Sequence, residues 1–287
     1  MDVRQFLTSS RILIVAGKGG VGKSAVAASL ALTAAHQGMT SLLVTLDPPG
    51  VVPPPHERLE TMSVSPGRAL ADYLSSHGLG RLTRRLATSG LVELVAQTAP
   101  GIDDLLVLGK IKSLERDLRA DLIVVDGPAS GHAIDLLRAP GVLRRAVPGG
   151  PIGQQADDVL AMMADASRCR TMLVATPAMT PVQEALDVAR ELTGTLGLAL
   201  GPAVVNMVDE RPPPVDATLL DDQLRRAWEW AESRSRAQAD AVSLLGRSLD
   251  TGRLLLPRHR LSGPDLVEAL AVDVATAIES FSAGASR

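Results

Sequence analysis

The chain has 287 residues, of which 46% are hydrophobic and 21% are charged, and its formal net charge is −3. These values are typical of a globular protein with a sizeable apolar core. The net charge gives no basic surface for nucleic acid, and an aromatic content of 2% leaves few groups for base stacking. The single cysteine, Cys169, excludes a disulfide or a thiolate cluster within one chain.

The sequence also bears on where the protein works. No apolar run approaches the ~18 residues expected of a membrane span. The first ten residues, MDVRQFLTSS, lack the charged-then-apolar layout of a signal peptide. We therefore expect a cytoplasmic protein.

Short apolar runs alternate with longer helical patterns along the chain, which predicts a doubly wound α/β fold around a mostly parallel sheet. The first strand is expected at residues 11–17, followed by a helix that ends near Gly38 and a second strand at 41–47. Further strands are predicted at 121–127, 171–177, 202–208 and 252–257, and helical patterns cover 69–119, 217–247 and the C-terminal segment. The proline-rich segment after the second strand is predicted to be a loop, because proline interrupts regular helix.

A glycine-rich motif joins the first predicted strand to the first predicted helix. Residues Gly17 to Ser24 fit the pattern G-x-x-x-x-G-K-[S/T] of a phosphate-binding loop, in the strand–loop–helix context that the motif requires. Inward-turned backbone N–H groups and the helix N-terminus would hold phosphates there. Lys23 would reach the β- and γ-phosphates, and the Ser24 hydroxyl would ligate Mg²⁺. The predicted nucleotide-binding residues are Gly17, Gly19, Gly20, Val21, Gly22, Lys23, Ser24 and Ala25; the alternative is a glycine-rich turn without a ligand.

A second lysine, Lys18, stands early in this loop, although only four of the chain's 29 basic residues are lysines. The sequence KGGVGKS resembles the deviant Walker A loop of the ParA, MinD and arsenical-pump ATPases. The resemblance implies that Lys18 reaches across a dimer to the nucleotide of the partner subunit and is catalytic there. The competing interpretation is a solvated surface lysine.

Other stretches point to one branch of that superfamily. The segment DLIVVDGPASGHAIDLLRAP, residues 121–140, resembles a signature of the arsenical pump-driving ATPases and of their relatives that target tail-anchored membrane proteins. Further similar stretches are TLDPPG, APGIDDLL, TPVQEALDVAR with Glu184, VVNMV, and SGPDLVEAL. The resemblance covers most of the chain and implies one P-loop ATPase domain over 1–287. The helical patterns lie in long connections, which predicts helical subdomain insertions at about 66–119 and 138–168.

The resemblance also implies roles for three strand-end residues. Asp126 would hold Mg²⁺ together with Ser24, Asp47 would orient or activate the attacking water, and Asn206 would read the adenine base. Each role is chemically suitable, because carboxylates hold Mg²⁺ through water and an amide can both donate to and accept from adenine. The alternatives are an ordinary strand-end aspartate, a turn or cap aspartate and a turn asparagine.

Three further residues stay open at this stage. His132 is expected to orient the loop after the fourth predicted strand rather than to act as a base or metal ligand. Lys110 and Lys112 could contact a partner or be exposed, and the sequence does not decide between these.

The chain departs from the family pattern in several places. It lacks the cysteines of a metalloid site, the C-x-x-C pair of a shared zinc site, and a long methionine-rich insert for a client helix. The prolines that follow Asp47 would stiffen a loop that must move during hydrolysis, so we expect a low rate for the chain alone. The segments GKIK and GGPIGQQAD resemble a short actinobacterial branch whose members tend to occur as two paralogues.

We therefore predict a dimeric ATPase that binds and hydrolyses Mg-ATP and couples its nucleotide state to an unidentified protein client. The dimer would contain two copies of the chain or one copy and a paralogue. A membrane link would arise only through the client. The alternatives are a nucleotide-gated scaffold or weakly active partner subunit, and a positioning ATPase of the ParA or MinD type.

Overall fold

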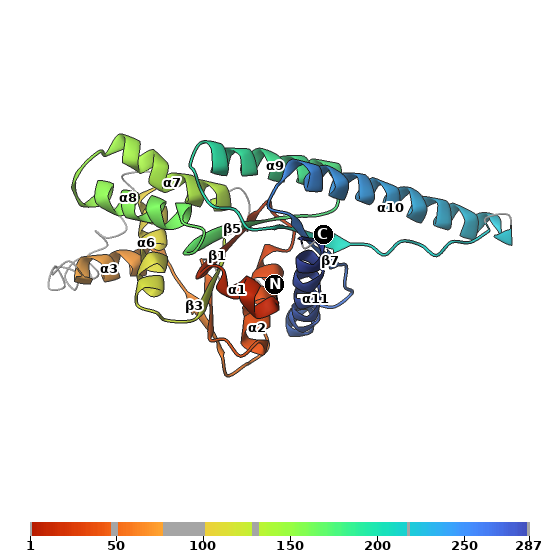
Figure 1. Ribbon diagram of the computed structural model, residues 1–287, viewed down its shortest axis with the longest axis horizontal. Coiled ribbons are helices and arrows are strands. Elements are labelled where there is room, and N and C mark those ends of the chain that lie inside the picture. Colours follow the sequence, from red (N-terminus) through yellow and green to blue (C-terminus); the bar gives the residue numbers. More distant parts are fainter. Residues whose placement is uncertain (1, 47–50, 77–100, 128–131, 217–218, 286–287) are drawn as a thin grey trace.

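The computed structural model describes residues 2–46, 51–76, 101–127, 132–216 and 219–285 (Figure 1). These segments form a seven-stranded sheet in the order β3-β2-β4-β1-β5-β6-β7, and every strand pair in it is parallel. The predicted α/β fold with a parallel sheet is confirmed. The strands are β1 (Ile12–Gly17), β2 (Ser41–Thr45), β3 (Leu59–Ser63), β4 (Leu122–Asp126), β5 (Cys169–Ala175), β6 (Ala203–Val208) and β7 (Arg253–Pro257).

Helices cover both faces of this sheet (Figure 1). One face carries α1 (Val3–Thr8), α2 (Lys23–His36) and α11 (Gly263–Ala285). The other carries α3 (Pro66–Ser76), α6 (Ile102–Arg116), α7 (His132–Ala146), α8 (Gly150–Ala164), α9 (Met179–Gly194) and α10 (Asp222–Ser248).

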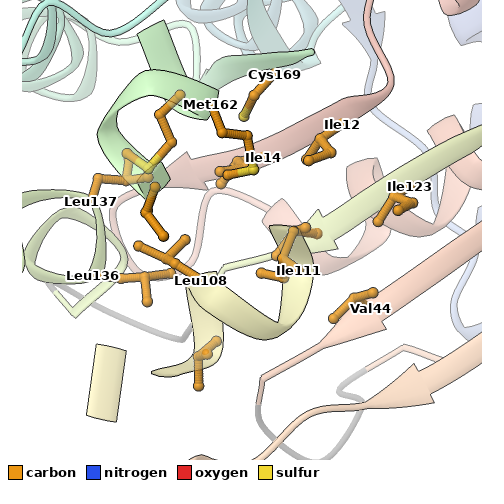
Figure 2. Packing of buried hydrophobic residues seen from close by; sticks show 14 of the residues in the cluster. Ile12, Ile14, Val44, Leu108, Ile111, Ile123, Leu136, Leu137, Met162 and Cys169 are labelled. Carbon is orange, nitrogen blue, oxygen red and sulfur yellow. The ribbon is translucent and has the colours of Figure 1, made fainter. Parts of the chain in front are cut away.

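Alternate residues of the central strands supply the two cores. Ile12 and Ile14 of β1 face the side of α6 to α9, whereas Leu13 and Val15 face α2 and α11. Such continuous apolar strands occur where both faces of a parallel sheet are covered. Figure 2 shows β1, β2 and β4 side chains around the buried Ile111 of α6, with side chains of α7 and α8 completing the cluster.

The helices expected in the two insertions pack into this same core. Val107 and Ile111 of α6 and Met162 of α8 belong to the cluster that contains β1 and β4. Ion pairs also connect these helices: Lys110 lies 2.6 Å from Asp72 of α3. Likewise, the ammonium of Lys112 lies 2.7 Å from Asp158 of α8. Both lysines are thus paired with neighbouring helices. The division into subdomains at 66–119 and 138–168 stays a prediction.

The elements that were not expected from the sequence include β3 and α1. Strand β3 pairs with β2 at one sheet edge, and its residues are mostly exposed, so it carries no apolar run. Helix α1 has only six residues, with the side chain of Asp2 capping its first turn through Gln5.

Much of helix α10 extends beyond the sheet (Figure 1). The segment after β6 runs outward along this helix, and the indole N–H of Trp228 donates to the carbonyl of Pro213 at 3.0 Å.

None of the described helices is long and apolar enough to cross a bilayer.

Candidate functional site

The glycine loop, residues 17–22, connects the end of β1 to the start of α2. Gly20 and Gly22 both have positive φ angles, of 81° and 86°. This left-handed backbone is easily adopted only by glycine, so the sequence determines the path of the loop directly. Gly22 is the N-cap of α2 and has no side chain to occupy the end of the helix.

Lys23 is buried at the start of α2, with a side chain that bends back over the loop. Its ammonium donates to the backbone carbonyl of Lys18 at 3.0 Å. Burial lowers the pKa of Lys23, and the carboxylate of Asp126 acts in the opposite direction by attraction. The chain therefore keeps a partly desolvated cation beside this loop.

Asp126 approaches this lysine because of the strand register. It is the last residue of β4 and lies between Val15 of β1 and Thr45 of β2 in the sheet. Residues in register share a face, and Val15 packs on the α2 side. Asp126 is thus directed toward the face from which α2 begins.

A cavity of about 470 Å³ opens beside Lys23. Its volume falls within the range of small-molecule sites. Its lining includes the predicted residues Gly19, Gly20, Gly22, Lys23, Ser24, Ala25 and Asn206. Gly17 and Val21 instead line a small space toward α9, together with Lys18.

Asn206 joins β6 to the glycine loop. It is buried, and its amide nitrogen donates to the carbonyl of Val21 at 2.9 Å. The following residue, Met207, has a φ of 62° at an irregularity in the β6–β7 pairing. The amide is therefore fixed at the cavity wall, with its oxygen still able to accept a hydrogen bond.

Lys18 points away from the cavity toward α9. Its ammonium lies 3.2 Å from the carboxylate of Glu184, and the lysine side chain is 50% exposed. The structure therefore brings together Lys18 and Glu184, two residues that belonged to separate motifs in the sequence.

The cavity lining also contains residues to which the sequence analysis assigned no role. The segment after β7 contributes Arg258, His259 and Leu261 to the lining, and α11 contributes Leu266 and Leu270. Leu266 and Leu270 lie in the stretch SGPDLVEAL that resembles the family, but nothing in the sequence marked Arg258, His259 or Leu261 as part of a site. Their placement depends on how β7 and α11 pack, which is a tertiary relationship.

Arg258 is held by a network centred on the partly buried Asp209. Its guanidinium bonds to Asp209, which also accepts from Arg234 of α10 at 2.6 Å and from Gln238 at 3.2 Å. Burial acts to raise the pKa of Asp209, but the hydrogen bonds from Arg258 and Arg234 hold it below its ordinary value. Asp209 therefore remains an anion that connects Arg258, a residue of the cavity lining, to α10.

Three residues discussed from the sequence do not line this cavity in the described part of the structure. Asp47 lies outside the described residues, and so does the side chain of His132. Cys169 is fully buried in the core, and burial raises the pKa of its thiol to about 12. A thiol in that state is a poor metal ligand and nucleophile.

Comparison with known proteins identifies the family. The chain is 32% identical over 225 residues to the ATPase BagA of Mycobacterium tuberculosis, in a match that covers 70% of this chain and 66% of that protein. The chain belongs to the ArsA/GET3 family of ATPases. This confirms the resemblance drawn from the sequence. The model of the anion-transporting ATPase family matches residues 10–52, which include β1, the glycine loop, α2 and β2.

More distant members of the ArsA/GET3 family are also similar. A Halobacterium salinarum protein named as an arsenical pump-driving ATPase is 26% identical over 280 residues, covering 86% of this chain and 41% of that protein. The ATPase GET3 of Chaetomium globosum is 27% identical over 154 residues, covering 48% of this chain and 45% of its own length. The matched region thus spans 66% or less of each of these three relatives.

Proposed function

We propose that this chain binds Mg-ATP in the cavity beside the glycine loop and hydrolyses it within a dimer that acts on a client protein. The carrying observation is that Lys23, Ser24 and Asn206, from separate parts of the sequence, line one cavity together with the loop glycines. Family membership supports the choice of ATP.

The roles of the phosphate-end residues follow from their chemistry. The backbone N–H groups of the glycine loop and the ammonium of Lys23 would hold the β- and γ-phosphates. Lys23 suits this role because a buried ammonium is attracted to an anion more strongly than a fully hydrated ammonium is. Asn206 would meet the adenine through the amide oxygen that its bond to Val21 leaves available.

The residues present also fit Mg²⁺. Within the described segments, no group of three or more His, Cys, Asp or Glu side chains gathers as a metal site. A dedicated protein cage is therefore absent there, and Mg²⁺ commonly uses one or two protein ligands plus phosphate oxygens and water. Ser24 and Asp126 would provide the protein part of that set, and the ion would supply charge neutralisation between the phosphates. Asp47 would orient the attacking water.

Lys18 supports the dimeric part of the proposal. Its ammonium is directed toward α9 and away from the cavity of its own chain, in contact with Glu184. A second subunit would therefore have to receive this lysine at its own phosphate end. There Lys18 would neutralise the charge that develops during phosphoryl transfer.

A turnover experiment tests the proposal. Phosphate release and the solution mass would be measured on the full chain with Mg-ATP, for the wild type and for Lys18→Ala. We expect a nucleotide-dependent increase in mass and a loss of about 100-fold or more in the turnover of Lys18→Ala, with ATP binding retained. Lys112→Ala is the matched control, since that lysine pairs with Asp158 between two helices.

The contrary outcomes are also distinct. Unchanged turnover in Lys18→Ala would reject the role of this lysine across a dimer. ATP binding without any phosphate release would favour a nucleotide-gated scaffold, and release that appears only with a paralogue would assign the chain to a heterodimer. The client would be sought among proteins that co-purify with ATP but not with ADP.

A further inference from the structure

Strand β7 is the last strand of the sheet, and no described strand pairs with its outer edge. Its register with β6 identifies the backbone groups that are left over. Ala203 of β6 is paired with Arg253, and it donates to the carbonyl of Gly252 at 3.0 Å. In a parallel ladder a residue bonds to the two neighbours of its paired residue, so Gly252 and Leu254 turn their backbone groups toward β6. Arg253 and Leu255 therefore direct their N–H and C=O groups away from the sheet.

A cavity of about 610 Å³ lies along this outer edge. Its lining includes Arg253, Leu255 and Pro257 of β7, together with Ala277 and Phe281 of α11. The volume falls within the range of ligand sites. The open edge of β7 thus has space beside it, and that space is bordered by apolar side chains of the neighbouring helix.

This cavity is separate from the one beside the glycine loop, since the two share only Pro257 in their linings. It also contains one carboxylate, that of Asp273. Oδ2 of Asp273 lies 2.5 Å from Nε2 of His259, and both side chains are about three-quarters buried. The acidic group of the cavity therefore already has a partner within the chain.

Arg253 provides an unpaired positive charge at the same edge. Its Nε is buried without a hydrogen-bond partner, and none of the described carboxylates forms an ion pair with its guanidinium. The guanidinium packs over Gly246 of α10, where a Cβ would overlap Nη1. A buried donor without an acceptor is unfavourable, so a ligand with a carboxylate would supply what Arg253 lacks.

A segment paired with β7 would have its side chains placed by the pleat of the sheet. Leu254 and Leu256 face the core beneath α11, whereas Arg253 and Leu255 face the other side, where Leu255 is 42% exposed. Side chains directly across from each other on one face of a sheet lie in contact. An acidic residue suits the place beside Arg253, and an apolar residue suits the place beside Leu255. These two residues of the segment would stand two positions apart.

The edge of a second copy of the chain fits this site less well. If two β7 strands paired antiparallel about Leu255, Arg253 of each would lie beside Pro257 of the other. Proline has no N–H to donate and no negative charge for the guanidinium. An arginine and a proline on an open edge are also features that oppose pairing between like edges. Charge complementarity therefore favours a different chain that carries an acidic residue.

We propose that the outer edge of β7 is a docking site for an extended peptide segment of another protein, with an acidic and an apolar residue two positions apart. The segment adds to the sheet as a further strand through the backbone groups of Arg253 and Leu255. Its carboxylate accepts from the guanidinium of Arg253. The site does not depend on what the glycine-loop cavity binds, so either proposal can fail without the other.

Peptide selection on the full chain tests the proposal. Random linear peptides of about ten residues would be displayed on phage, and the most enriched one would be synthesised with blocked ends. We expect enriched sequences to share the acidic and apolar pair, and Arg253→Gln to weaken binding of the synthetic peptide at least about tenfold. Arg190→Gln is the matched control, since Arg190 is an exposed arginine on α9, and it should leave binding within about twofold of the wild type.

Hydrogen exchange of the wild type tests the backbone pairing without any substitution. The amides of Arg253 and Leu255 should exchange at least about tenfold more slowly when the peptide is bound. Leu255→Pro, which removes one outward N–H from an edge position that tolerates proline, should weaken the peptide to a similar extent.

Three outcomes would overturn the proposal. The first is that no peptide is enriched. The second is that the enriched peptide binds Arg253→Gln as well as it binds the wild type, or leaves exchange at Leu255 unchanged. The third is that the solution mass of the wild type alone rises with protein concentration and that Leu255→Pro abolishes the rise, because the edge would then belong to a second copy of the chain.

Discussion

The ammonium of Lys18 and the carboxylate of Glu184 lie 3.2 Å apart within one chain, and both are partly exposed. An exposed ion pair contributes up to about 1 kcal/mol, which corresponds to about fivefold in an equilibrium constant. Glu184 therefore retains the loop lysine only weakly, so that a second subunit could take it over at little energetic expense.

We predict that Glu184→Gln lowers the protein concentration needed for half-maximal ATP hydrolysis by about two- to fivefold. The lysine released from Glu184 would be available to the partner subunit without first breaking an ion pair. The dependence of turnover on protein concentration measures this. Glu60→Gln, which removes the partner of Arg119 in a similarly exposed pair, is the control and should leave the curve in place.

Removing the charge of Asp126 should remove most of the gain in ATP affinity that Mg²⁺ provides. We predict that Mg²⁺ strengthens ATP binding by the wild type at least about tenfold, and that this gain falls to about twofold or less in Asp126→Asn. Titrations with and without the ion provide the comparison. Asp121→Asn is a suitable control, because Asp121 accepts from Thr40 just before the same strand begins. A full Mg²⁺ effect in Asp126→Asn would remove this residue from the metal site.

The two left-handed glycines should differ in their tolerance of a side chain. A Cβ at Gly22 would lie 2.3 Å from the amide nitrogen of Asn206, whereas a Cβ at Gly20 would have no atom within 4 Å. Gly20→Ala should therefore lose about 1 kcal/mol of unfolding free energy from backbone strain alone. Gly22→Ala should lose about 1–3 kcal/mol more and weaken ATP binding, because Asn206 must move. Urea unfolding of the two variants checks the difference, and equal losses would contradict the contact with Asn206.

Acid should weaken the hydrogen bonds that Arg258 and Arg234 donate to Asp209. Since the pKa of Asp209 is lowered in the folded protein, its stabilising effect is present above the ordinary carboxyl pKa of 3.8 and is lost as the pH falls through the folded value. We predict that Asp209→Asn costs about 1.5–3 kcal/mol of unfolding free energy at pH 7, from the lost charge-assisted hydrogen bonds. The gap between this variant and the wild type should close below about pH 4. A gap that does not depend on pH would mean that the charge of Asp209 contributes little.

The sequence predicted the central elements because they carry local signals. The apolar runs of β1, β2 and β4 and the glycine motif before Lys23 each define their own local structure, so their positions along the chain could be predicted. Strand β3 escaped detection because an edge strand with mostly exposed side chains shows no such run. Its pairing with β2 becomes evident only in three dimensions.

The residues of the candidate site also divide into those with a local sequence signal and those brought together only by tertiary packing. The residues proposed to hold phosphate lie in one continuous motif, and the family resemblance pointed to Asn206; both assignments stay predictions. His259 and Asp273 stand fourteen positions apart, and both lie outside the stretches that resemble the family. Their meeting depends on the packing of α11 beside β7, and Lys18 meets Glu184 through a similar tertiary contact. Pairs of this kind leave no pattern in a single sequence.

The two anchors of the segment after β7 also bear on how quickly a ligand binds. Arg258 is tied to Asp209 and His259 to Asp273, so this wall of the cavity loses little conformational entropy when a ligand arrives. Association should then be limited by encounter and not by slow rearrangement of this wall. We therefore expect single-exponential association, with a rate that rises linearly with nucleotide concentration and shows no plateau.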